Sequence, residues 1–340
     1  MQCSVCNEPN DDDASYCEGC GTPLTDAAKH STGDTASGGA AKAVDPLIEC
    51  PGCHAGPGCI DAEGHCTNCG TKRKMAPRDH FHQALSAKVA GVSDIGMKYK
   101  ENQDFMALGE KPGCLALVVC DGMSNSQNPM KGSKAAAELA RDMLISGADR
   151  SDVDALFKEV ADACQEAICK TPFDVNNVDR EGRMILPAQS TFVAALVQGR
   201  RVTVGWIGDS RAYWLSDSGC QQLTHDHSWL NEAIAGGMSR EEAEKNKLSH
   251  AITRSLGAAD DGTDPGVEAP EMRTLNITGK GTLVVCSDGL WNYLKNEEHL
   301  RSLIAQTAQA DALTAARKLV TFAREAGGHD NITAVVAYLQ

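Results

Sequence analysis

Short apolar runs separated by polar turns fill the chain from about residue 86 onward. Runs of four to eight apolar or β-branched residues between turn residues are typical of buried strands. The strands predicted in this way are Ala87–Val92, Leu115–Cys120, Thr191–Gln198, Arg201–Ile207, Arg211–Leu215, Met272–Ile277, Thr282–Cys286 and Ile332–Leu339.

Three other segments repeat their apolar residues at three- and four-residue spacing, which predicts helices. They are Lys131–Ser146, Val153–Cys169 and Asp311–Ala326, the last with Asp311 as its N-cap. The helices fall in blocks between groups of strands and do not alternate with them one to one. This order predicts packed antiparallel sheets covered by helices, an α+β fold, and disfavours a parallel doubly wound sheet.

Four of the apolar runs lead directly into, or directly follow, an acidic residue. The acidic residues are Asp121, Asp209, Asp288 and Asp330, and each has Gly or Asn beside it. Carboxylates at strand ends can converge on one pocket, and oxygen-only ligand sets suit Mg²⁺ or Mn²⁺. Asp-Gly is also a common turn dipeptide, so any one of these positions alone predicts a turn. All four together favour a metal site.

The first 75 residues have a different pattern, with two pairs of CxxC knuckles, each pair ending in Cys-Gly. Two thiolates separated by two residues can reach one ion, and two such knuckles complete a tetrahedral Zn²⁺ site. Both segments resemble the zinc ribbon family, and metal binding would supply the folding energy that so small a core lacks. His54, Cys59 and His65 are spare ligands that could replace a cysteine. The predicted Zn²⁺ ligands are Cys3, Cys6, Cys17 and Cys20 in one ribbon and Cys50, Cys53, Cys66 and Cys69 in the other.

The same changes of composition predict the domain boundaries. Residues 1–24 and 48–75 are the two ribbons, residues 25–47 are a flexible linker rich in Ala, Gly, Ser and Thr, and residues 76–85 are a basic linker. Residues 86–340 then form one large domain. A ribbon could dock a protein or nucleic acid, or serve as a spacer, because its fold does not state its ligand.

The composition of the chain limits the cellular compartments and the classes of partner that we expect. The formal net charge of −14 disfavours affinity of the whole chain for nucleic acid. No apolar run is long enough to cross a bilayer, and the first residues lack the pattern of a signal peptide. We therefore expect a cytoplasmic protein without a membrane partner. The six cysteines after residue 69 are interpreted as small buried hydrophobes and not as disulfides.

From Ser93 to Gln340 the chain resembles the type 2C metal-dependent serine/threonine protein phosphatases, in particular their bacterial branch. Each matching motif is weak alone, but their order along the chain is that of the family. The motifs are Ser93–Gly96, Asn102–Asp104, Val119–Met123, Gly208–Arg211, Ser287–Trp291 and His329–Thr333. The resemblance implies a four-layer αββα sandwich, with two central antiparallel sheets between helices.

The resemblance also implies a ligand set for two Mn²⁺ or Mg²⁺ ions. Asp121 would bridge the two ions, with the backbone carbonyl of Gly122 on the second, while Asp288 and Asp330 complete the first. Asp104 would lie in the same cluster and hold metal-bound water, and Asp209 would share a third, weaker ion with Asp288. Paired ions make a water nucleophilic near neutral pH and neutralise the phosphate, so no phosphoenzyme is needed.

Two positions depart from the family pattern. Many members have a phosphate-clamping arginine where this chain has Tyr99. Lys98 and Lys100 are candidate phosphate-binding residues beside it, but on an extended strand they would face away from position 99, and a lysine is only a point charge. The segment after Asp121 has fewer glycines than usual, and its Met123 stands where eukaryotic members have a histidine and bacterial members a methionine.

Residues 223–256 resemble the flap of bacterial members. Ser239 and Glu242 are spaced as a helix-capping box. His225 and His227 are more simply interpreted as hydrogen-bonding loop residues than as metal ligands. The tryptophans Trp206, Trp214 and Trp291 predict core packing.

These observations favour an active phosphatase that removes phosphate from phosphoserine and phosphothreonine residues of proteins. Its substrates would be proteins that a serine/threonine kinase phosphorylates. The ribbons would dock a protein partner or the substrate. A phosphoprotein-binding pseudophosphatase or scaffold is the alternative, motivated by Tyr99 and the altered turn. A nucleic-acid adaptor is disfavoured by the acidic composition.

Overall fold

The computed structural model describes residues 53, 66–71, 79–179, 181–257, 264–307 and 311–340. The chain divides into two compact units, Met1–Ala76 and Pro77–Gln340. The predicted ribbon 1–24, the linker 25–47 and most of the ribbon 48–75 lie outside the described residues. None of the helices in the described part has the length and apolar composition needed to span a bilayer.

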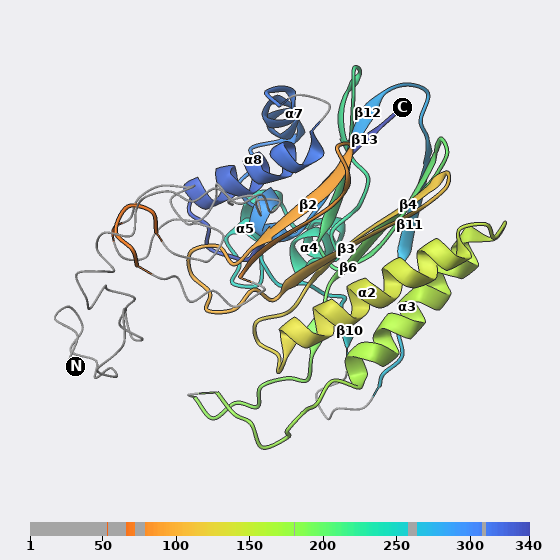
Figure 1. The fold of residues 1–340 in the computed structure, drawn as a ribbon. Coiled ribbons are helices and arrows are strands. Elements are labelled where there is room, and N and C mark those ends of the chain that lie inside the picture. The colour runs from red at the N-terminus through yellow and green to blue at the C-terminus, as the bar shows by residue number, and fades with distance from the viewer. Residues whose placement is uncertain (1–52, 54–65, 72–78, 180, 258–263, 308–310) are drawn as a thin grey trace, which may run out of the picture. The chain divides into compact units, whose positions relative to one another are not determined.

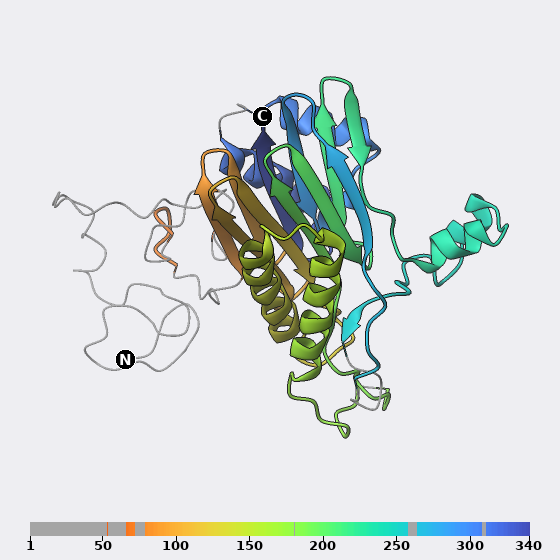
Figure 2. The same cartoon turned by 90° about the vertical axis from the view of Figure 1, so that its right-hand side faces the viewer.

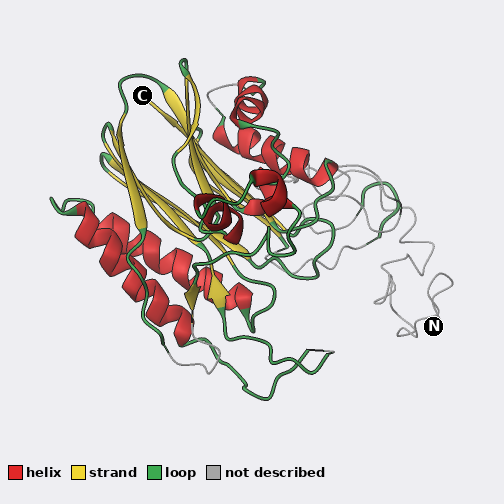
Figure 3. Ribbon diagram, turned by 180° about the vertical axis from the view of Figure 1, so that it is seen from behind, coloured by secondary structure: helices red, strands yellow, loops and turns green. Residues whose placement is uncertain are grey.

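The second unit is built on two antiparallel sheets (Figures 1 and 3). The first sheet contains, in spatial order, β1 (His80–Ser86), β2 (Val89–Asp94), β13 (Ile332–Leu339), β12 (Gly281–Cys286), β8 (Arg211–Ser216) and β9 (Gly219–Gln222). The second contains β11 (Glu271–Asn276), β7 (Arg201–Ile207), β6 (Phe192–Gln198), β4 (Cys114–Asp121) and β3 (Asp104–Lys111). A short pair, β5 (Gln189–Ser190) and β10 (Leu256–Gly257), lies apart from both.

Helices cover the outer face of each sheet, which gives four layers. The long helices α2 (Pro129–Gly147) and α3 (Val153–Cys169) pack together, and α2 lies on β3 and β4 (Figure 1). On the other side α8 (Ala312–Glu325) lies on β2 and β13, and α7 (Glu297–Ala305) contacts β9. The predicted αββα sandwich and its α+β class are therefore confirmed.

Two apolar clusters hold these layers together. One joins α2 and α3 to the second sheet and includes Phe157 and Leu196, both fully buried. The other fills the space between the sheets with residues such as Leu117 and Val335. Because β4, β12 and β13 are buried on nearly all positions, the ends of these strands are fixed in space.

Three short helices lie outside the four layers. The one-turn helix α6 (Asp288–Trp291) follows β12 directly, while α4 (Trp229–Ala235) and α5 (Arg240–Glu244) form the flap. Figure 2 shows the flap helices, in turquoise, standing out to the side of the sandwich. The predicted capping box is present, since Ser239 and Glu242 bond each other's backbone at the start of α5.

Each predicted strand and helix appears within a few residues of its expected bounds, and Asp311 caps α8 as predicted. The linker prediction for 76–85 is wrong in its second half. Residues 80–86 form β1, which pairs with β2 along its length, so the catalytic unit begins before residue 86. Its half-exposed, histidine-containing pattern lacks an apolar run, and pairing with β2 supplies the order that local sequence does not.

Candidate metal centre

Five aspartates from both sheets meet at one end of the sandwich. Asp121 ends β4 and Asp104 begins β3, where the two are register partners. The other three follow β7, begin α6 and precede β13, and they are Asp209, Asp288 and Asp330. The carboxyl of Asp121 is within hydrogen-bond reach of both Asp104 and Asp288. The structure thus brings together all the acidic residues that the sequence singled out.

A cavity of about 440 Å³ opens onto this cluster. Four of the five aspartates line it, together with Gly122, Met123, Ser124 and the flap residue His250. The glycine after Asp288 permits close packing here, because a Cβ on Gly289 would overlap the backbone oxygen of Asn331. The Asp288-Gly289 dipeptide therefore lets α6 lie close to the segment that precedes β13.

The fifth aspartate, Asp104, is fully buried and held by hydroxyl groups. Its Oδ2 accepts hydrogen bonds from Ser287 Oγ and Thr333 Oγ1, both at 2.7 Å. Ser287 Oγ in turn accepts the backbone N–H of Thr333 at 3.0 Å. These contacts join β3, β12 and β13 and fix the carboxylate in one orientation.

Burial and mutual repulsion raise the pKa of every carboxyl in the cluster. Burial is the largest cause in each case, and the negative charge of a neighbouring aspartate adds to it. The pKa is raised to about 6 for Asp104 and Asp288, about 7 for Asp330 and about 8 for Asp209, and well above the usual range for Asp121. Such an arrangement is stable at neutral pH when cations balance it.

The donor set fits hard divalent cations. It consists of carboxylate oxygens and the nearby backbone of Gly122, the ligand type that Mg²⁺ and Mn²⁺ prefer. In addition, Oδ1 of Asp288 is buried without a hydrogen-bond partner in the described part of the chain. A buried carboxylate oxygen left unsatisfied in this way is costly, and a bound cation would satisfy it.

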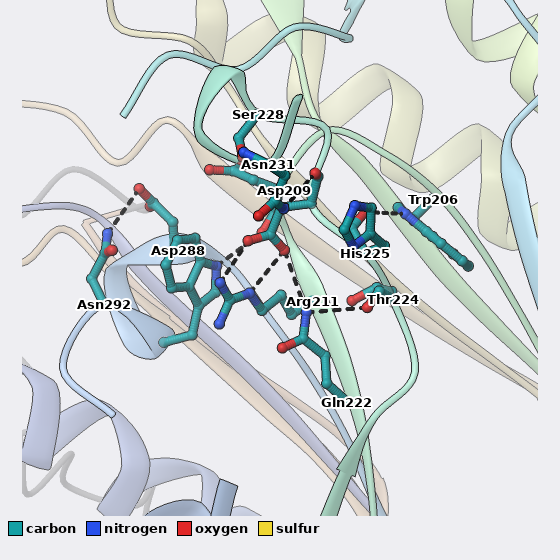
Figure 4. A network of polar contacts seen from close by, with 12 residues as sticks. Trp206, Asp209, Arg211, Gln222, Thr224, His225, Ser228, Asn231, Asp288 and Asn292 are labelled. Carbon is teal, nitrogen blue, oxygen red and sulfur yellow. Dashed lines mark hydrogen bonds and ion pairs between the residues drawn. The ribbon is translucent and has the colours of Figure 1, made fainter. Parts of the chain in front are cut away.

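A cation–aromatic contact ties Asp209 to the rest of the site, and Figure 4 shows the surroundings of Asp209, Arg211 and Asp288. The guanidinium of Arg211 lies 3.6 Å from the ring centre of Trp291 and forms two bonds to the carboxylate of Asp226, at 2.9 and 2.5 Å. The indole N–H of Trp291 donates to the backbone oxygen of Asp209 at 2.9 Å. Because Trp291 and Asp288 share α6, this stack couples the positions of two cluster aspartates.

The prediction of core packing holds for Trp206 and Trp214 and is wrong for Trp291. The first two are 4% and 9% exposed, whereas Trp291 is half-buried and lines a second cavity of about 300 Å³ beneath the flap. The role of Arg211 and Trp291 was missed. Their adjacency to Asp209 and Asp288 was the available signal, but their contact joins residues far apart in sequence.

The hydrogen-bonding role predicted for the flap histidines is confirmed for the side chain of His227. Nδ1 of His227 accepts the backbone N–H of Gly208 at 2.9 Å, and the backbone oxygen of His225 accepts the indole N–H of Trp206 at 2.7 Å. Burial is the main cause that lowers the pKa of His227, followed by the charge of Arg254. The flap base is therefore fastened to the loop that carries Asp209.

The segment with Lys98, Tyr99 and Lys100 is a turn, so the extended strand assumed for it is wrong. Both lysines are exposed, and neither is among the described residues that line the acidic cavity. The side chain of Tyr99 is half-buried and hydrogen-bonds Ser124. The structure thus places the tyrosine, and not the lysines, beside the cluster.

Part of the second predicted zinc site is described. The sulfur atoms of Cys53, Cys66 and Cys69 all lie within 4.8 Å of one another, and Cys53 Sγ is 3.7 Å from Cys66 Sγ. Three sulfurs this close can share one Zn²⁺. Cys50 and the first ribbon's Cys3, Cys6, Cys17 and Cys20 lie outside the described residues.

Comparisons with known proteins agree with this geometry. Residues 98–322 match the family Protein phosphatase 2C, and residues 3–76 match the family Double zinc ribbon. A putative protein phosphatase of Mycoplasma genitalium is 28% identical over 276 residues, covering 78% of this chain and 98% of the relative.

Two solved structures have the same fold at slightly lower identity. The PPM Ser-Thr phosphatase MsPP of Mycobacterium smegmatis, in complex with cacodylate, is 27% identical with a TM-score of 0.58, covering 76% of this chain and all of that one. The catalytic domain of the serine threonine protein phosphatase PstP, in complex with two manganese ions, is 25% identical with a TM-score of 0.56, covering 74% of this chain and 98% of that one.

A sandwich with a carboxylate cluster at one end of its two sheets defines a phosphatase with a divalent-metal centre. Since the matched residues make up well over half of its length, the chain belongs to the protein phosphatase 2C family.

Proposed function

We propose that this protein phosphatase hydrolyses phosphoserine and phosphothreonine residues of proteins, with Mn²⁺ or Mg²⁺ held by the acidic cluster. One observation carries the proposal: five aspartates from separate segments of the chain meet in one cluster, and four of them line a single cavity. The named activity and the two manganese ions of the related phosphatases support it.

The resemblance to the phosphatase family supports a separate role for each aspartate. Asp121 would bridge two ions, with the backbone of Gly122 on one and Asp288 and Asp330 on the other. Asp104 would support the same pair, and Asp209 with Asp288 would hold a third ion. Ions held by these residues would supply a nucleophilic water near neutral pH and would balance the charge of the phosphate.

The chain itself contributes rigidity and access. Asp121 ends a buried strand, and two hydroxyl donors hold Asp104 in place, so little reorganisation is needed when cations bind. The cavity leaves the cluster open to a phosphorylated side chain, between the turn at Met123 and the flap at His250. Met123 has no titratable group, so this position cannot supply a proton to the leaving alkoxide.

A binding-only pseudophosphatase is the second candidate, and Tyr99 in place of the family's arginine favours it. A titration of Mn²⁺ against hydrolysis of a phosphothreonine peptide separates the two. The phosphatase requires turnover that rises with Mn²⁺ and disappears when it is chelated. Peptide binding without turnover at saturating Mn²⁺ would establish the pseudophosphatase instead.

We further propose that the N-terminal region binds two structural Zn²⁺ ions and docks a protein partner or the substrate. The grouped sulfurs of Cys53, Cys66 and Cys69 support the second site. Comparison of the full chain with a chain that begins at Pro77, and so keeps β1, tests the docking role. Equal kcat/KM on a small phosphate ester but a lower value on the protein substrate for the shorter chain is expected.

The opposing serine/threonine kinase, the cytoplasmic location and the absence of a nucleic-acid or membrane partner stay predictions. Salt-dependent binding of the full chain to DNA or RNA would contradict the prediction on nucleic acid.

A further inference from the structure

Two of the positions that depart from the family pattern touch each other beside the acidic cluster. Tyr99 stands in the turn after β2, and Ser124 stands in the turn after β4. The hydroxyl of Tyr99 hydrogen-bonds the side chain of Ser124, and Ser124 Oγ donates to Oε1 of Gln103 at 2.8 Å. Three polar side chains therefore form one short chain of hydrogen bonds beside the cluster.

The turn that carries Tyr99 is held in place from the metal side. The amide of Asn331, the residue after Asp330, donates to the backbone oxygens of Ile95 at 2.9 Å and Glu101 at 3.1 Å, on either side of Tyr99. A Cβ at Gly96, whose φ is +72°, would overlap the backbone oxygen of Asp330. Glycine and asparagine thus fix the tyrosine relative to a cluster aspartate.

Ser124 is equally well placed. It is exposed and lines the cavity together with Asp121, Asp288 and Asp330. Its neighbour Gln103 is held by its backbone N–H, which donates to Oδ1 of Asn331 at 2.8 Å. The same asparagine therefore supports both ends of the hydrogen-bond chain.

We propose that the Tyr99 and Ser124 hydroxyls form a phosphate subsite, in which they donate hydrogen bonds to the non-bridging oxygens of the substrate phosphoryl group. This subsite deepens the proposed function and rests on it. Hydroxyl hydrogens rotate freely, so each donor can turn from its present partner to a phosphoryl oxygen. Burial, more than the nearby carboxylates, raises the pKa of Tyr99, which keeps its hydroxyl protonated as a donor.

A subsite of neutral hydroxyls differs physically from one of lysines. Tyr99 is half-buried and bonded to Ser124, which lines the cavity, whereas Lys98 and Lys100 are exposed, so that solvent screens their charges. Direct hydroxyl donors give a modest, salt-insensitive contribution to phosphate binding, whereas exposed lysines would give a contribution that falls with ionic strength.

The test is a calorimetric titration of inorganic phosphate into the full-length, Mn²⁺-loaded protein. We expect Tyr99→Phe and Ser124→Ala each to weaken phosphate binding by about 3- to 10-fold. The double variant should lose less than the product of the two, since the residues contact each other. Lys98→Met and Lys100→Met are the matched controls and should stay within about twofold of the wild type, as expected for surface charges.

Two further measurements separate binding from structure. Mn²⁺ affinity should be the same in all the variants, and KM for a phosphothreonine peptide should rise with kcat nearly unchanged. Unaltered phosphate binding in Tyr99→Phe and Ser124→Ala would overturn the subsite. A parallel loss of Mn²⁺ affinity, or a larger loss in the lysine variants, would do the same.

The phosphate titration needs no turnover. A wild-type protein that binds Mn²⁺ and phosphate but hydrolyses no phosphopeptide would therefore refute the proposed function and leave the subsite standing.

Discussion

Buried carboxylates occur in two kinds of surroundings in this protein. Asp94 and Asp226 are 1% and 8% exposed, and each faces basic side chains: His80 and Arg324 around Asp94, Arg211 at Asp226. The aspartates of the cluster instead face one another. They are Asp104, Asp121, Asp209, Asp288 and Asp330.

The difference shows which charges serve the fold and which serve the function. When a buried carboxylate contacts a guanidinium or imidazole, the protein itself balances its negative charge. A group of carboxylates that mainly face one another raises the free energy of the folded state unless cations enter. The protein maintains this unfavourable arrangement at the end of two rigid sheets, where the carboxylates are placed to bind cations.

The largest expected effect comes from Asp288→Asn, which changes one aspartate of the cluster and leaves the paired aspartates as they are. The amide removes one charge and a ligand oxygen from the cluster, so we expect phosphopeptide kcat/KM to fall on the order of 1,000-fold. Asp162→Asn, an exposed aspartate on α3, is the matched control and should keep full activity. Activity retained in Asp288→Asn would remove this residue from the centre.

Arg211→Met tests the ion pair between Arg211 and Asp226. It leaves the buried carboxylate of Asp226 without its bidentate partner, and we expect a loss of about 3 kcal/mol in the free energy of unfolding. Asp288→Asn in protein free of Mn²⁺ and Mg²⁺ should have the opposite sign, a gain of about 1 kcal/mol or more at pH 8, because repulsion is relieved. Urea unfolding of both variants checks the signs, and equal signs would contradict the distinction.

Ser287→Ala tests the support of the cluster. The hydroxyl that donates to Asp104 is lost, so we expect Mn²⁺ affinity to fall about 10-fold with little change in fold. Ser302→Ala is the control, since its hydroxyl bonds only the backbone oxygen of His299 on the surface of α7. Calorimetric titration measures the Mn²⁺ affinity of both variants. An unchanged affinity in Ser287→Ala would show that Ser287 is not needed to position Asp104.

The last prediction concerns the dependence of stability on pH. The folded-state pKa of these carboxyls lies above the unfolded value, so the folded protein binds more protons between about pH 4 and 8. Stability of the protein dialysed free of Mn²⁺ and Mg²⁺ should therefore fall as pH rises through this range. Saturating Mn²⁺ should flatten the slope, and a slope that is the same with and without Mn²⁺ would contradict the assignment.

Sequence reasoning succeeded where one segment contains the whole signal. The largely buried strands β4, β12 and β13 appear in the sequence as apolar runs, and the acidic residues beside their ends are found from those runs. It failed for β1, whose order comes from pairing with β2. The four-residue helix α6 was also missed, because it is too short for any periodicity.

The surroundings of the cluster were less predictable because they depend on contacts between distant segments. The turn at Tyr99 is set by Asn331 and Asp330, more than 200 positions away. In the same way, the aromatic side chain of Trp291 predicts burial in the core. Its position instead results from its contacts with Arg211 and with the backbone of Asp209. Motif spacing identifies the ligands, whereas packing decides what lies around them.

The central claim is that this cluster is a binding site for paired divalent cations. Anomalous diffraction from a crystal soaked in Mn²⁺ tests it most directly. The account predicts two strong manganese peaks, one among Asp121, Asp288 and Asp330 and one beside Asp121 and Gly122. Density that shows these side chains without any bound manganese would contradict it.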